Sequence, residues 1–161
     1  MRTILITLFT MFVLNIFSQT KLDKLVFKKV NEYRKQKGLP EFLWDDKVYK
    51  ASNHHLKYLL KNSITTHFEK TDTPTSYLRL KKYGVDPFLS GENIAVVSFF
   101  KMDEELIAID IINGWKNSPG HNENLLSSEY KKSAVSCGQG VLKKFGPEYK
   151  CMFSNMVFYS E

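Results

Sequence analysis

The sequence predicts an α+β fold in which helices pack on a small antiparallel sheet. Two observations predict it. Helical spacing accounts for four or five segments, most of them before residue 126, whereas strand-like runs fall mainly in the last third. The two kinds of element are segregated along the chain and do not alternate, which is typical of α+β proteins. The 161 residues, 43% hydrophobic and 25% charged, suit one domain with a single core.

The N-terminus predicts an export signal over residues 1–19. Arg2 precedes a mostly apolar run, Ile4–Phe17, and Ser18-Gln19-Thr20 follows it. This is the order of a secretory signal peptide, and 14 residues are short for a membrane span. An uncleaved N-terminal anchor is the alternative. We expect a mature domain over 20–161, without a transmembrane span, that is secreted or lies in the periplasm or cell envelope.

The first two helices are predicted from apolar spacing and end signals. Apolar residues recur at helical intervals over 22–33, and Gly38 supplies the stop. Asp45 or Asp46 is expected to cap a second helix, which ends near Asn62.

A cap followed by proline marks two short helices. Thr73-Pro74 is expected to start one that Gly84 closes, and Ser118-Pro119 to start another that runs through Leu126. Between them, Asp103 caps a helix over 104–117 whose acidic first turn suits the helix dipole.

Three strands complete the prediction. A short run over 94–99 follows a loop that ends in Ser90-Gly91. Runs over 134–141 and 149–158 flank turn material at 143–147 and predict a hairpin. Folded near Lys144, this hairpin would place Cys137 directly opposite Cys151, and an oxidising compartment would let them form a disulfide. Two free buried thiols are the alternative.

The net charge of +6 gives little information about partners. The lysines are spread over several segments and are not interleaved with aromatic residues. A solvated face, or attraction to an anionic envelope surface, is therefore favoured over nucleic-acid binding. We expect a monomer with no nucleic-acid partner.

Several short motifs follow one another along the chain, each occurring once. They are Val30-Asn31-x-x-Arg34-x-x-x-Gly38-Leu39, Trp44-Asp45-x-x-Val48-x-x-Ala51-x-x-His54, His67 after two threonines, Arg79 with Gly84, Gly91-Glu92-Asn93-Ile94-Ala95, and Trp115-x-x-Ser118-Pro119-Gly120-His121-x-x-Asn124-Leu125-Leu126. In this order they resemble the CAP superfamily (cysteine-rich secretory, antigen 5 and pathogenesis-related 1 proteins, or SCP domain), in its bacterial single-domain branch. The resemblance implies an α-β-α sandwich with helices on both faces of the sheet.

The resemblance also implies a polar cleft, which the family lines with two histidines and two acids. Transfer by motif gives His67, Glu92 and His121, and Ser118 stands where the eukaryotic branch has the second acid. Two imidazoles and a carboxylate suit a divalent metal such as zinc, held by His67 and His121 with Glu92 as a third ligand. No other cofactor is implied.

Each of these residues also has a structural interpretation. Glu92 would hold a loop by accepting backbone N–H groups, His121 would bond His67 or Glu92 in a polar cluster, and Ser118 is favoured as a helix N-cap. Four other residues are expected to pack rather than to function: His54, His55, Trp44 and Trp115, the last walling the cleft.

The function favoured by the resemblance is an exported binding or interaction module whose cleft takes a lipid, glycan or peptide. The alternative is a metal-assisted, peptidase-like hydrolase in which Glu92 acts as base or third ligand. Ser118 in place of the second acid weakens this alternative, because it removes a possible base or orienting group. A purely structural envelope protein is the third possibility. The chain contains no nucleophile elbow, phosphate loop or His-Glu-x-x-His helix.

Overall fold

The computed structural model describes residues 19–142 and 149–161, and in these ranges five helices enclose a four-stranded sheet. The helices are α1 (Lys21–Gln36), α2 (Asp46–Asn62), α3 (Ser76–Lys82), α4 (Glu104–Lys116) and α5 (Pro119–Leu126). The strands are β1 (Leu43–Trp44), β2 (Leu89–Ser98), β3 (Lys132–Val141) and β4 (Lys150–Ser160). Residues 1–18 of the expected signal and the expected turn at 143–147 lie outside the described residues. Over the described ranges, none of the helices has the length and apolar character needed to span a bilayer.

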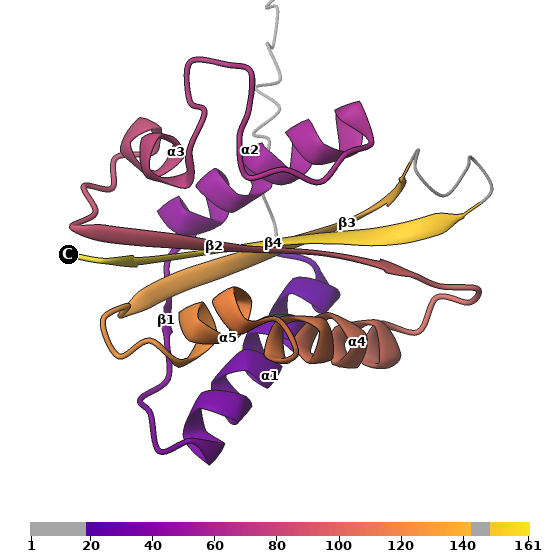
Figure 1. The fold of residues 1–161 in the computed structure, drawn as a ribbon, viewed down its shortest axis with the longest axis horizontal. Helices are drawn as coiled ribbons and strands as arrows, with labels where there is room; N and C mark the ends of the chain where they lie inside the picture. The colour runs from indigo at the N-terminus through magenta and orange to yellow at the C-terminus, as the bar shows by residue number, and fades with distance from the viewer. Residues whose placement is uncertain (1–18, 143–148) are drawn as a thin grey trace, which may run out of the picture.

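The sheet has the strand order β1-β3-β4-β2 and is covered by helices on both faces. Figure 1 shows α2 and α3 on one face and α1, α4 and α5 on the other. This confirms the α+β class and the α-β-α layers. The three long strands are antiparallel, but β1 pairs with β3 in parallel, so the sheet is mixed. The antiparallel sheet expected from the sequence is formed by the three long strands, and the parallel β1 adds to it unannounced, because two residues carry no detectable strand pattern.

Alternation along the central strand β4 connects the two layers of core. Because successive side chains of a strand point to opposite faces, β4 supplies both layers. Met152, Met156 and Phe158 are buried against α1 and α4, whereas Phe153 and Val157 are buried in the clusters that include α2.

Helix ends follow the local capping signals. Thr20 and Asp23 form a capping box at α1, and Asp45 and Asp103 accept backbone N–H groups at the starts of α2 and α4. The start of α3 differs from the prediction. Its cap is Thr75 rather than Thr73, because the carbonyl of Pro74 accepts hydrogen bonds in the preceding loop.

Strand β2 begins at Leu89, five residues before the predicted start. Ser90-Gly91, expected in a loop, is paired with β4. The reason for the glycine is a close approach: a Cβ at position 91 would lie 2.7 Å from the Tyr130 hydroxyl and 2.9 Å from Oδ1 of Asn124. A glycine interpreted as a loop signal thus marks a crowded point within a strand.

The predicted disulfide is wrong, since both cysteines are free thiols. In the hairpin, Cys137 lies opposite Ser154, and Cys151 lies opposite Gly140. The two cysteines are therefore offset by three positions, roughly 10 Å along the strands, and their side chains point to opposite faces. Bridging needs Cα atoms within about 7 Å and converging Cβ atoms, so this register excludes the bond.

Candidate functional site: a cleft at the edge of the sheet

A cleft of about 480 Å³ opens along β2, between the loop after α2 and helix α5. Its size falls within the range of small-molecule sites. An apolar wall and two imidazoles make up most of its surface. The lining residues are Thr65, Thr66, His67, Ile94, Ala95, Val96, His121 and Leu142.

His67 and His121 face each other across this cleft. Their ring centroids lie 6.4 Å apart, and half of the His67 side chain is exposed. His67 comes from the loop after α2, whereas His121 lies in the first turn of α5. The amide of Asn93 fixes that turn, because its Nδ2 donates to the carbonyl of His121 at 2.9 Å.

Glu92 lies behind His67 and is not among the lining residues. It is buried, and its Oε2 lies 3.0 Å from Nδ1 of His67. Its other oxygen, Oε1, accepts from Nη2 of the fully buried Arg79 at 2.7 Å. Both carboxylate oxygens are thus occupied by side chains of this protein.

A second buried carboxylate, Glu69, extends the cluster behind the cleft. Its Oε1 lies 2.7 Å from Nδ1 of His55 and 3.5 Å from Nη1 of Arg79. The other ring nitrogen of His55 lies 2.7 Å from the carbonyl oxygen of Thr66. His55 therefore packs inside the protein, as expected, and it also holds the loop that carries His67.

The charges of this cluster set the ionisation of Glu92. Burial acts to raise the pKa of Glu92, but the hydrogen bond from His67 and the charges of Arg79 and His55 outweigh it and lower the pKa. Burial lowers the pKa of His121, and the neighbouring His67 lowers it further. Glu92 is consequently a weak base held as an anion, and His121 favours the neutral imidazole.

This arrangement does not fit the predicted divalent metal site. A third ligand would have to come from Glu92, but Arg79 holds one of its oxygens and places a positive charge beside it. Among the described residues, no group of three His, Cys, Asp or Glu side chains is arranged to hold a metal ion. The remaining pair, His67 and His121, lacks the three or four protein ligands usual at a zinc site.

Ser118 and Trp115 lie away from the cleft wall. Ser118 is the N-cap residue of α5, as predicted, although its side chain makes no capping hydrogen bond. Trp115, expected to wall the cleft, is fully buried in the core between α1, α4 and the sheet. It faces inward because Ile111 and Leu125 pack in the same cluster.

Sequence reasoning missed Arg79 and Glu69 as members of the site. One signal for Arg79 was available: the chain has 23 Lys plus Arg, of which only three are arginines. Arginine is the cation suited to buried, bidentate pairing, so an arginine in a lysine-rich protein indicates such a position. Both arginines in the described residues, Arg34 and Arg79, are buried.

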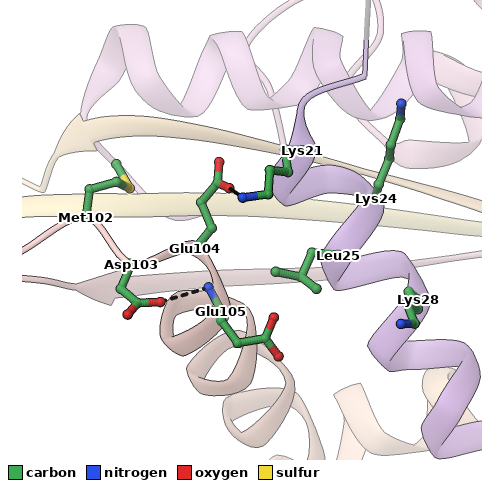
Figure 2. A pocket seen from close by; sticks show the side chains of 8 residues that line it. All are labelled: Lys21, Lys24, Leu25, Lys28, Met102, Asp103, Glu104 and Glu105. Atoms are coloured by element: carbon green, nitrogen blue, oxygen red, sulfur yellow. Dashed lines mark hydrogen bonds and ion pairs between the residues drawn. The ribbon is translucent and has the colours of Figure 1, made fainter.

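A second hollow, of about 560 Å³, lies between the N-terminal ends of α1 and α4 (Figure 2). Its walls carry three lysines and three acidic residues, so their charges balance. Some of these charges are already paired, as in the contact of 3.1 Å between Lys21 and Glu104. The described residues that line this hollow include neither imidazoles nor buried polar groups, and the cleft along β2 is the stronger candidate.

The chain matches a known protein family over most of its length. The model of the cysteine-rich secretory protein family, CAP, matches residues 27–149. The chain belongs to the CAP family. Among curated proteins, this CAP domain is 29% identical over 127 residues to the uncharacterized membrane protein YlbC of Bacillus subtilis, and 28% identical over 136 residues to an uncharacterized protein of Borreliella burgdorferi. The matches cover 79% and 80% of this chain, but 33% and 81% of those proteins.

Solved structures share the same CAP fold. An extracellular SCP-domain protein from Bacillus anthracis has a TM-score of 0.65 and 26% identity, over 87% of this chain and 40% of that one. An outer surface protein from Borrelia burgdorferi has a TM-score of 0.65 and 23% identity, over 89% and 96% of the two chains. A cysteine-rich secretory protein from Staphylococcus aureus has a TM-score of 0.60 and 18% identity, over 91% and 41%. This CAP domain therefore spans less than half the length of two of these three proteins.

Proposed function

We propose that this CAP domain is an exported binding module that takes a ligand in the cleft between His67 and His121. The observation that carries this proposal is the burial of Glu92 and its ion pair with Arg79. The one acidic residue that the family motif brings to the cleft is buried behind it and neutralised by Arg79. Among the described residues that line the cleft there is no carboxylate.

The composition of the cleft supports binding rather than hydrolysis. Ile94, Val96 and Leu142 offer apolar surface, and His67 and His121 offer ring nitrogens for a polar group. A mostly apolar pocket with a few polar groups that fix orientation is the usual design of a ligand site. A hydrolase would need a base with a raised pKa, whereas the pKa of Glu92 is lowered.

Export is part of the same proposal. Residues 1–19 have the order of a secretory signal peptide. Two proteins of similar fold are described as an extracellular protein and an outer surface protein. A location outside the cytoplasm would present the cleft to lipids, glycans or peptides of the cell envelope.

The test is an NMR screen. The ¹⁵N-labelled protein is expressed in a host that exports it, and the exported form is purified. Three probe sets are used: medium-chain fatty acids, cell-wall oligosaccharides and short peptides. We expect one set to shift the amides of residues 65–67, 94–96 and 121. His67→Ala and His121→Ala should each weaken that binding by about tenfold, the effect of one lost polar contact of about 1.4 kcal/mol.

Met102→Ala, in the second hollow, is the matched control and should leave binding within about twofold. The proposal is wrong if the probes change the amide chemical shifts of the second hollow only, or if no probe changes those of the cleft residues. Hydrolysis of any probe that disappears in Glu92→Gln would restore the enzyme alternative.

A further inference from the structure

The open half of β2 forms one wall of the cleft, and β2 is an edge strand of the sheet. In an antiparallel ladder, alternate residues turn their backbone N–H and C=O toward the partner strand, and the others turn them away. The N–H of Phe99 donates to the carbonyl of Lys150, at the end of β4. With the uninterrupted register from Leu89 to Ser98, residues 93, 95 and 97 therefore face β4.

Ile94 and Val96 consequently turn their backbone groups away from β4, toward the cleft that they line. Glu92 has the same orientation, and Nδ2 of Asn124 reaches its carbonyl at 3.5 Å, which confirms the direction. Within the described residues, the outward backbone groups of Ile94 and Val96 pair with no other strand.

The first half of β2 is closed, whereas the second half is open. At the first half, Nδ2 of Asn124 reaches the outward carbonyl of Glu92 at 3.5 Å, and Asn124 and Tyr130 pack over the sheet face at Gly91. Ile94 is 8% exposed, Ala95 to Val97 are partly exposed and Ser98 is exposed, so the strand opens progressively from Ile94 onward. Ile94, Ala95 and Val96 line the cleft together with His67 and His121.

The open stretch also lacks the usual protection of an edge. Exposed edges are normally blunted by a charge, a proline, a bulge or a very short strand. The sequence from Ile94 to Ser98 is Ile-Ala-Val-Val-Ser, in a ten-residue strand whose pairing has no bulge. Such an edge offers hydrogen bonds to any extended chain of suitable length.

We propose that the ligand of the cleft is an extended peptide that adds to the sheet as a strand beside Ile94 and Val96. This inference rests on the proposed function and names its ligand class. Five strand residues span roughly 17 Å, so the bound segment is on the order of five residues long. Its alternate side chains lie over Ile94, Val96 and Leu142, which selects apolar residues at every second position.

Substitution of Val96 separates backbone pairing from side-chain contact. Val96→Pro removes an outward N–H that the β2–β4 ladder does not use, and proline is tolerated at such edge positions. Val96→Thr keeps this N–H and the branched shape. The probe is a library of eight-residue peptides with valine or isoleucine at alternate positions and the other positions randomised. The strongest binder is labelled and its affinity measured by fluorescence polarisation.

We expect Val96→Pro to weaken binding by about tenfold or more, and Val96→Thr to change it by less than about threefold. Unfolding of both variants in urea checks that they fold. A second measurement needs no variant: N-methylation of each peptide amide in turn should reduce affinity at every second position only, because only alternate amides face β2.

Equal affinity of wild type and Val96→Pro, or an N-methylation scan without the two-residue period, would overturn strand addition. So would a library that yields no binder. These outcomes concern strand addition, and the proposal of a binding module is then decided by the probe screen and the histidine variants. A ligand that still depends on His67 and His121 would leave the binding module standing, whereas no cleft ligand of any class would remove both.

Discussion

Asp23 and Glu92 are buried carboxylates at opposite edges of the same sheet, and their surroundings differ in kind. Asp23 faces the β3 edge, where its Oδ1 accepts from the N–H of Cys137 at 2.7 Å. Its Oδ2 accepts from the Tyr49 hydroxyl and from the N–H of Thr20. In the chain that retains residues 1–19, these donors are all neutral. Glu92, at the β2 edge, is met by the charged guanidinium of Arg79 and by imidazoles.

The pKa values shift in opposite directions as a result. Burial raises the pKa of Asp23 more than its hydrogen bonds lower it. At Glu92, burial is outweighed by the hydrogen bond from His67 and the charge of Arg79. At the β3 edge, hydrogen bonds from neutral donors hold Asp23 in a structural role. At the β2 edge, Glu92 is a fixed anion behind an open cleft.

Arg79→Met should have the largest effect on stability. The substitution leaves Glu69 and Glu92 buried without their shared cation, and breaking a buried ion pair in this way costs about 3–5 kcal/mol. Urea unfolding at neutral pH measures it. Adding Glu92→Gln to Arg79→Met should recover part of the loss, because one uncompensated charge disappears. A double variant less stable than Arg79→Met would contradict the role given to the pair.

Asp23→Asn should have a smaller but clear effect, on the order of 1–3 kcal/mol. The substitution replaces one acceptor oxygen with an N–H₂ donor. That donor must then face the N–H of Cys137 or that of Thr20, both of which are donors. Urea unfolding measures the change. The matched control is Asp46→Asn in the first turn of α2, an exposed carboxylate expected to stay within about 0.5 kcal/mol. Equal losses in the two variants would contradict the structural role of Asp23.

The sequence allowed better predictions for the β2 edge, with its cleft residues, than for the β3 edge. Helix ends are local, so neighbouring residues alone indicated Asp103 and Ser118 as N-caps, and Asp45 or Asp46 as the cap of α2, which is Asp45. The family motifs likewise identified His67, Glu92 and His121, which the structure brings together. Their functional role stays a prediction.

The long-range features could not be predicted, for physical reasons. The register of β3 and β4 depends on which faces are buried and on the length of the connection between them, and an error of three positions in the hairpin produced the wrong disulfide. The pairing of Arg79 with Glu92 joins residues 13 positions apart through a helix, a loop and a strand. No periodicity in the sequence encodes that contact.

The two carboxylates should also give opposite dependences of stability on pH. Because the pKa of Glu92 is lowered, its contribution is present above its usual 4.5 and is lost as the pH falls through the lowered value. Because the pKa of Asp23 is raised, its contribution is present below its usual 3.8 and is lost as the pH rises through the raised value. The destabilisation by Glu92→Gln should therefore grow from acid to neutral pH, and that by Asp23→Asn should shrink.

Urea unfolding of wild type and both variants, prepared with residue 19 retained so that the Thr20 nitrogen is a neutral amide, measures these trends across the acid range at constant ionic strength. Their difference should amount to about 1 kcal/mol or more for a shift of one pKa unit. Parallel trends in the two variants would show that the edges do not differ electrostatically as described.

His67→Gln should give the smallest effect, a change in titration with little change in stability. His67 is half exposed, and glutamine keeps a polar group beside Glu92 while removing the second ionisable ring. Burial is the larger cause of the lowered pKa of His121 and the charge of His67 the smaller one. In His67→Gln the pKa of His121 should therefore rise, yet stay below its usual 6.5, because the burial remains. NMR titration of the His121 ring protons measures this. A pKa that does not move would mean that the two imidazoles, 6.4 Å apart, do not act on one another, and the open edge would then present two independent groups to its ligand.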